Sequence, residues 1–238
     1  MTFSSAIKRQ INRYRHAATK KTSYAQCGED LIVEYAARTL GLPQVRHLDL
    51  GAHHPIYLSN TYLFYLQGHR GVCVEADASL LPAFRRHRPL DIVLNAGVGP
   101  QDAQLPFYVM TTPTLNTFSR AEAERYASYG RERIERVEQV GIRGVKGLVA
   151  EFFPDGLEFV SLDVEGLDLA ILEAFDFASA RPPIFCVETL TYTEDGTERK
   201  LGEIIAFMDS VGYFAYADTY VNTIFVDRAA WARRAARG

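Results

Sequence analysis

The stretch VRHLDLGA, residues 45–52, decides the fold of this chain. An apolar run that ends in an acid and a Gly-Ala turn is typical of a buried parallel strand, and such a turn lets backbone N–H groups approach a ligand beyond the strand's carboxyl end. The next apolar run, GVCVEA at 71–76, ends at Glu75. Glu75 follows Asp49 at a spacing close to the roughly 20 positions expected for the acid that binds ribose hydroxyls in a βαβ unit. The two runs therefore predict a Rossmann-like sheet that binds a ligand with a free ribose.

The turn after the first strand argues against a dinucleotide. A dinucleotide fingerprint needs three glycines, whereas Gly51 stands alone and is followed by the bulky pair His53-His54. The alternative is that Gly51 only ends a strand and that Asp49 caps a helix. A further acidic strand end, DVEG at 163–166, favours a cofactor cleft, because the carboxyl ends of parallel strands meet at one edge of a sheet.

Length and composition favour one domain. With 238 residues, of which 47% are hydrophobic and 23% charged, the chain can bury the core of a single α/β domain. Cys27, Cys73 and Cys186 are far apart and odd in number, so we expect core residues in a reducing compartment and neither a disulfide framework nor a zinc site. No run reaches the roughly 20 apolar residues of a membrane span, and no signal-peptide pattern opens the sequence. We therefore expect a cytoplasmic protein.

Basic residues gather at the start of the chain, although the formal net charge of the whole chain is -3. Residues 1–22 contain no acid and carry Lys8, Arg9, Arg13, Arg15, Lys20 and Lys21. With apolar residues near helical spacing, this basic arm is predicted to form an amphipathic helix that contacts an anionic surface, such as the inner membrane or an anionic polymer, or another subunit of a homo-oligomer. The alternative is a solvated helix packed on its own domain. Residues 23–238 are then a single domain.

The rest of the chain alternates between strand and helix patterns, which is typical of an α/β fold with a mostly parallel sheet. Residues 101–155 break this rhythm with an edge strand, a polar loop and a charged helix, and we interpret them as an insertion over the active face. Two closing strands at 213–218 and 222–227 are predicted to form an antiparallel hairpin. A doubly wound sheet with such a hairpin is the class I methyltransferase version of the Rossmann-like fold. The core strands are expected at 45–50, 71–76, 91–96, 158–164 and 183–188.

Five segments, taken in order, resemble the signature of a known family. They are SYAQCGEDL (23–31), DLGAHHP (49–55), SNTY (59–62), LNTFS (115–119) and LDVEGLD (162–168). Over about Ser23 to Asp227 the chain is similar to the FkbM family of S-adenosylmethionine-dependent O-methyltransferases, and most to a bacterial branch found with polysaccharide biosynthesis. The resemblance implies methyl transfer to a hydroxyl of a sugar or glycoconjugate, with no nucleic acid as partner.

The expected cofactor, S-adenosylmethionine, has no phosphates, which fits a turn with one glycine. Glu75 is expected to accept hydrogen bonds from both ribose hydroxyls. Strand ends and the loop after the first strand supply the other candidates: Ala76, Asp77, Asn95 and Ala96 beside the adenine, and Asp49, Gly51, Ala52, Ser59 and Asn60 beside the methionine end. The resemblance adds Gln26, Glu29 and Asp30 at the methionine end. Capping and salt-bridge roles at the first helix are the alternative for these three.

The reaction implied is an in-line displacement at the sulfonium methyl, in which a sugar hydroxyl needs a base or a metal to raise its nucleophilicity. Asp163 and Glu188 end successive core strands, so we expect them to hold a divalent cation such as Mg²⁺, or one of them to act as the base. Glu165, His53 and His54 are further candidates for the base. A histidine in a loop is also often a hydrogen-bonded structural residue.

We expect the loop 111–119 and the segment 120–141 to recognise the acceptor, because inserted loops carry specificity. Tyr126 and Tyr129 would stack on a sugar ring or, as we favour, pack an amphipathic helix. Two other functions remain open. A nicotinamide-dependent oxidoreductase would use the same strand ends, but the chain lacks the further glycines and an evident Tyr-x-x-x-Lys pair. A non-catalytic nucleoside-binding scaffold would not need acids at three strand ends.

Overall fold

The computed structural model describes residues 21–164, 166–191 and 197–234. Nearly all of the predicted basic arm, residues 1–22, lies outside the described residues, and so does Glu165. No helix within the described ranges has the length and apolar character needed to cross a membrane.

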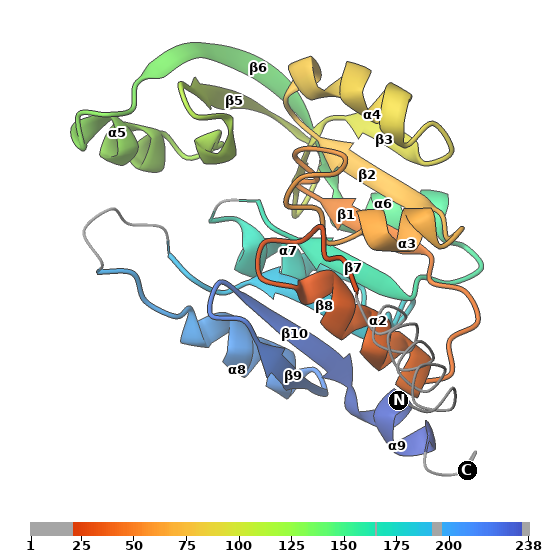
Figure 1. Ribbon diagram of the computed structural model, residues 1–238. Helices are drawn as coiled ribbons and strands as arrows, with labels where there is room; N and C mark the ends of the chain where they lie inside the picture. Colours follow the sequence, from red (N-terminus) through yellow and green to blue (C-terminus); the bar gives the residue numbers. More distant parts are fainter. Residues whose placement is uncertain (1–20, 165, 192–196, 235–238) are drawn as a thin grey trace, which may run out of the picture.

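A seven-stranded sheet forms the centre of the molecule, in the order β3-β2-β1-β7-β8-β10-β9 (Figure 1). Within this sheet the neighbouring strands β3, β2, β1, β7 and β8 run parallel to one another. Strand β10 lies antiparallel to both of its neighbours, β8 and β9. The bounds are β1 His47–Leu50, β2 Gly71–Glu75, β3 Ile92–Asn95, β7 Phe159–Leu162, β8 Ile184–Glu188, β9 Tyr213–Asp218 and β10 Asn222–Asp227. This order confirms the predicted Rossmann-like class I methyltransferase sheet with its C-terminal antiparallel hairpin.

Helices cover both faces of the main sheet (Figure 1). On one face lie α2 (Glu29–Thr39), α3 (Tyr62–Leu66), α4 (Leu81–His87) and α9 (Arg228–Arg234). On the other lie α6 (Val145–Phe152), α7 (Asp168–Ala174) and α8 (Gly202–Ser210). Between them, β1 and β7 are buried along their whole length, as expected for central strands of a parallel sheet.

The cysteines only partly follow the sequence prediction. Cys73 and Cys186 are buried in strands of the main sheet, and all three cysteines are free. Cys27 is exposed, in the turn before α2, so the expectation that it belongs to the core was wrong. Its neighbours in the sequence are polar or small, and the turn leaves no apolar layer to cover it.

A second, three-stranded sheet in the order β4-β6-β5 is inserted between β3 and β7 and extends beyond the main sheet (Figure 1). It comprises β4 (Gly97–Gly99), β5 (Ala103–Met110) and β6 (Ile134–Gly144), with the short helix η2 (Pro113–Leu115) and α5 (Arg120–Ser128) between β5 and β6. The hydroxyl of Ser119 accepts a hydrogen bond from the backbone N–H of Glu122 and caps α5. The charged stretch after α5 forms the long strand β6.

Strand register brings the acidic strand ends together. Leu50 pairs with Val74 on one side and with Leu162 on the other, and Leu162 pairs with Val187. Because the parallel strands end level with one another, the residues that follow them share one edge of the sheet.

Candidate functional site

A cleft of about 390 Å³ opens at the carboxyl edge of the main sheet. Its walls come from the loops that follow the parallel strands, from the start of β10 and from the small sheet. Most residues predicted for the site line this cleft: Gln26, Asp49, Gly51, Ala52, His53, Ser59, Asn60, Glu75, Ala76, Ala96, Asp163 and Glu188. The fold thus collects acids from four strand ends around one cavity.

Two residues expected beside the adenine lie outside the cleft lining. The side chain of Asn95 donates hydrogen bonds to the backbone carbonyls of Glu75 and Ala76, at 3.0 and 2.9 Å. Asp77 accepts from the backbone N–H of Ser79 at 2.9 Å and from the side chain of Asn116 at 3.2 Å. Both side chains therefore support the loop after β2, in place of the direct ligand contact that their strand-end positions suggested.

The two histidines after β1 have different surroundings. His54 lies outside the cleft lining, and its Nδ1 accepts hydrogen bonds from the backbone N–H groups of Ile56 and Tyr57. It therefore shapes a turn, which is the structural alternative for a loop histidine. His53 lines the cleft with a positive φ of 47°. Burial, and then the neighbouring His54, lower the pKa of His53, which keeps its imidazole neutral at pH 7 and available as a base.

Gly51 is required by close packing of two strand ends. Its φ is +78°, and a Cβ at this position would lie 1.8 Å from the carbonyl oxygen of Asp163. The backbone N–H groups of Gly51 and Ala52 both donate to the carbonyl of Val74, at 3.1 Å. The expectation that these N–H groups face a ligand was therefore wrong, because the register with β2 gives them a partner in the sheet.

Glu75 presents a fixed carboxyl group to the cleft. It is buried, and its two oxygens accept from the backbone N–H groups of His53 and Asp77, at 2.7 and 2.6 Å. Burial raises the pKa of Glu75 to about 7, although these two hydrogen bonds act in the opposite direction. Each carboxylate oxygen has a second lone pair, so the group can still accept two hydrogen bonds from a ligand.

The loop after β1 ties the cleft to β7. Asn60 donates from its side-chain amide to the hydroxyl of Ser161, at 3.1 Å. The hydroxyl of Ser59 accepts from the backbone N–H of Tyr62 at 3.1 Å. The hydroxyl of Thr61 donates to the carboxylate of Asp49. Ser161, which no sequence pattern marks as a site residue, thus joins the predicted pair Ser59 and Asn60 in the cleft wall.

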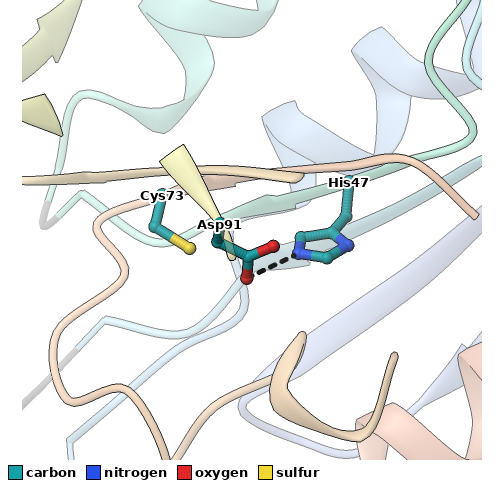
Figure 2. Close-up of side chains that lie close together, drawn as sticks. All are labelled: His47, Cys73 and Asp91. Carbon is teal, nitrogen blue, oxygen red and sulfur yellow. Dashed lines mark ion pairs between the residues drawn. The ribbon is translucent and has the colours of Figure 1, made fainter. Parts of the chain in front are cut away.

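Behind the cleft, His47, Cys73 and Asp91 form a buried cluster of residue types that bind metals (Figure 2). The guanidinium of Arg88 already occupies this space. It lies 2.7 Å from Asp91 and 3.0 Å from Nε2 of His47. A metal ion would have to displace a buried cation that neutralises Asp91, so we interpret the cluster as an internal ion-pair network.

Asp163 and Glu188 both line the cleft, and the interaction between their carboxyl groups lowers the pKa of Asp163. Two carboxyl groups in contact share a hydrogen bond when one of them carries a proton. Burial has the larger effect and raises the pKa of Asp163 above its ordinary value. Near neutral pH the pair can therefore hold or accept one proton.

Asn222, missed from the sequence, adds an oxygen beside this pair. It stands directly opposite Glu188 in the antiparallel β8–β10 pair, and its side chain lines the cleft. Its amide nitrogen donates to Glu29, whose carboxylate also accepts from the hydroxyl of Thr219. Since a carboxylate only accepts, the amide oxygen of Asn222 must point away from Glu29; this oxygen is buried and has no hydrogen-bond partner among the described residues.

Glu29 and Asp30 lie outside the cleft lining and hydrogen-bond to neighbouring segments of the described chain, without the side-chain cap or the salt bridge that the structural alternative named. Both are fully buried. Asp30 accepts from the hydroxyl of Ser23 and the backbone N–H of Tyr24, at 2.6 and 2.8 Å. Of the three residues expected at the methionine end by resemblance, Gln26 lines the cleft, and the two acids hold the segment that carries it.

The insertion contributes more to the cleft than expected. The lining residues that it supplies are Phe107, Pro113, Thr114, Leu115, Asn116 and Phe118. The rings of Phe107 and Phe118 lie 4.8 Å apart, and a Cβ on Gly97 would lie 2.5 Å from Phe118. Asn116 donates to Asp77, just after Glu75, so loop 111–119 borders the half of the cleft near Glu75. Tyr126 is buried and Tyr129 partly buried in a small apolar cluster, which agrees with the packing role that we favoured.

A model of the methyltransferase FkbM domain family matches residues 49–215 of the chain. No curated protein matches the chain in a sequence comparison.

Solved structures with a similar fold include several methyltransferases. A TehB-like SAM-dependent methyltransferase from Corynebacterium glutamicum is 9% identical, with a TM-score of 0.41 over 94% of this chain and 100% of that chain. A 1,6-didemethyltoxoflavin-N1-methyltransferase from Burkholderia thailandensis, with bound S-adenosylhomocysteine, is 13% identical, with a TM-score of 0.39 over 94% and 87% of the two chains. A precorrin-6y C5,15-methyltransferase from Geobacter metallireducens is 12% identical, with a TM-score of 0.40 over 87% and 91%.

Proposed function

Because the chain belongs to the FkbM methyltransferase family, we propose that it transfers the methyl group of S-adenosylmethionine to a hydroxyl of a sugar or glycoconjugate. Methyl transfer from S-adenosylmethionine follows from the family, which sets aside the nicotinamide-dependent alternative. The oxygen acceptor and the sugar class are the proposal. The observation that carries this proposal is the pair of carboxyl groups of Asp163 and Glu188, which line the cleft and can accept a proton.

The cofactor is proposed to span the β1 and β2 side of the cleft. Glu75 accepts from the ribose hydroxyls, and its position is fixed by two backbone donors. The adenine lies toward Phe107 and Phe118, where the insertion offers an apolar wall. The methionine end then reaches Asp49 and Gln26 on the far side of Glu75.

Binding of S-adenosylmethionine is expected to tighten as the pH rises through about 7. The pKa of Glu75 in the unliganded protein is raised to about 7, and only the ionised carboxylate accepts from both ribose hydroxyls. Affinity should fall by up to about tenfold for each pH unit below this value. Calorimetry at a series of pH values measures the effect, and Glu75→Gln should bind weakly with little pH dependence.

The stability of the unliganded protein provides an independent check on the same pKa. The folded-state pKa of Glu75 lies above its unfolded value, so the stabilising contribution is present at low pH and is lost as the pH rises toward about 7. The unliganded wild-type protein should therefore lose more stability than Glu75→Gln over this range.

Equal cofactor affinity at pH 6 and pH 8, within the roughly twofold scatter of such measurements, contradicts the ribose assignment.

The chemical step places the acceptor oxygen in line with the methyl carbon and the sulfur. The oxygen–carbon bond forms as the carbon–sulfur bond breaks, and the electron pair of that bond remains on sulfur as the neutral thioether of S-adenosylhomocysteine. The hydroxyl proton passes to the carboxyl pair, through Asp163. Because burial raises the pKa of Asp163, its carboxylate is a stronger proton acceptor than an ordinary aspartate.

The acceptor half of the cleft suits a ring with polar edges. Hydroxyl groups can donate to the unpartnered amide oxygen of Asn222 and to Glu188. Tyr57 also lines the cleft, and 64% of its surface is exposed, so an aromatic face is available at the mouth. Acceptor oxygens beside an exposed aromatic ring match the hydroxyl groups and the C–H face of a pyranose.

The same oxygens fit a hard divalent cation. Asp163, Glu188 and Asn222 offer an oxygen-only donor set, and the buried Asn222 oxygen otherwise has no partner among the described residues. We extend the proposal to Mg²⁺ or Mn²⁺ held by these three residues. Such a cation would lower the pKa of a coordinated hydroxyl group.

Exhaustive chelation is therefore expected to abolish methyl transfer, and added Mg²⁺ or Mn²⁺ should restore it. Binding of S-adenosylmethionine should change little, because Glu75 and Asp49 lie on other strand ends. Activity is followed by release of S-adenosylhomocysteine, and cofactor binding by calorimetry on the same samples. Full turnover after chelation would remove the cation from the proposal and leave the carboxyl pair as a metal-free base.

A further inference from the structure

Arg88 is a fully buried cation directly behind the cleft, in the first position after α4. Its guanidinium donates to Asp91 through Nε at 2.8 Å and lies 3.0 Å from Nε2 of His47. The remaining amino group donates to the hydroxyl of Thr61 at 2.9 Å. The side chains of Tyr65 and Phe84 lie beside the guanidinium. Every direction around this charge is thus occupied by protein.

Thr61 connects this buried charge to the cleft. The guanidinium is always protonated and cannot accept, so the hydroxyl oxygen of Thr61 must be the acceptor in its bond with Arg88. The single hydroxyl proton of Thr61 is then free to donate to Asp49, which lies closer than its further contact, the hydroxyl of Ser59 at 3.5 Å. Arg88 itself stays 3.9 Å from the Asp49 carboxylate, beyond hydrogen-bond distance. The hydrogen-bonded connection between Arg88 and Asp49 therefore runs through Thr61, beside their longer direct ion pair.

The hydrogen bond from Thr61 restricts the rotation of the Asp49 carboxylate. One of its oxygens is engaged by Thr61 from behind, and the residue lines the cleft in front. A carboxylate with one oxygen fixed in this way cannot turn away from the cavity without breaking the hydrogen bond. A buried ion pair by itself is weak evidence for stability, since apolar residues of similar volume often serve as well. The network is better explained by what it does to Asp49.

We propose that Thr61 is a positioning residue, oriented by Arg88, that fixes the carboxylate of Asp49 toward the ammonium group of S-adenosylmethionine. This inference rests on the proposed placement of the methionine end beside Asp49. The ammonium and the carboxylate form a charge-assisted hydrogen bond, which depends on direction as well as on charge. A freely rotating Asp49 would keep its charge and lose this direction.

The test compares three ligands with two substitutions. Thr61→Val keeps the shape of the side chain and removes the hydroxyl, whereas Thr61→Ser keeps the hydroxyl. S-adenosylmethionine and S-adenosylhomocysteine carry the ammonium, and 5′-methylthioadenosine lacks the whole amino-acid end. In calorimetry, Thr61→Val should bind the first two about tenfold more weakly and bind 5′-methylthioadenosine as the wild type does. Thr61→Ser should stay within about twofold of the wild type for all three.

Two other patterns of binding would overturn the inference. Equal weakening for all three ligands would mean that Thr61 only supports the loop, and unchanged binding of all three would mean that it does not position Asp49; either result overturns the inference. A wild-type protein that binds none of the ligands would instead refute the proposed function. Thermal unfolding establishes that each variant is folded. If Thr61→Val does not fold, Thr61→Cys provides the same comparison, because a thiol is a weak donor of similar size.

Discussion

Asp163→Asn is expected to lower kcat by about 100- to 10,000-fold, because it removes the group that takes the hydroxyl proton. The amide has the same shape as the carboxyl group, and cofactor affinity should remain within about threefold of wild type, since the ribose and methionine contacts lie on other strands. Single-turnover release of S-adenosylhomocysteine measures the chemical step, and calorimetry measures binding.

Asp168→Asn is the matched control for this substitution. Asp168 is also a buried acid, with a pKa raised by burial to about 7, and it follows Asp163 closely in the sequence. Its carboxylate accepts from the backbone N–H groups of Val164 and Gly166 at the start of α7, and it does not line the cleft. The control should lose stability and keep most of its kcat. Similar kcat values for the two variants would refute Asp163 as the proton acceptor.

Gly51→Ala is expected to destabilise the protein by about 3 kcal/mol or more and to abolish detectable cofactor binding. An added Cβ would lie 1.8 Å from the carbonyl oxygen of Asp163, in a backbone conformation with φ +78°. Relief of this clash requires β1 and β7 to separate at the cleft. Chemical denaturation measures the loss of stability, and calorimetry measures the loss of binding.

Gly68→Ala separates the cost of the left-handed backbone conformation from the cost of the steric clash. Gly68 has a φ of +92°, and a Cβ there would meet no atom within 4 Å. This variant carries the backbone penalty alone, about 1 kcal/mol, and should bind the cofactor normally. If both alanine variants behaved alike, close packing at Gly51 would not be what shapes the cleft.

The sheet and its acidic edge were predictable because both depend on local patterns. Short apolar runs that end in an acid mark Asp49, Glu75 and Asp163 as strand ends, and parallel strands end at a common edge whatever their order. The antiparallel position of β10 was also predictable, from the hairpin spacing at the end of the chain. All three acids line the cleft.

The residues that support these acids could not be found in the same way. Asn222 lines the cleft only because the register of β10 places it opposite Glu188. Thr61 acquires its role only because Arg88, at the end of α4, donates a hydrogen bond to its hydroxyl. Neither contact has a sequence pattern, since each joins residues far apart in the chain. The backbone N–H groups after β1 were misjudged for a similar reason, because their partner, Val74, is set by the pairing of β1 with β2.

The position of β10 bears on how the chain acquires its structure during synthesis. This strand is nearly the last part of the described chain to leave the ribosome, yet it lies between β8 and β9 in the finished sheet. Until it arrives, β8 has an unpaired edge and β9 has no partner in the main sheet, and such edges invite association between nascent chains. Because Asn222 opens β10, the cleft also lacks one wall until that moment. A translation product truncated before β10 would therefore lack this wall of the cleft and carry an open sheet edge that favours aggregation.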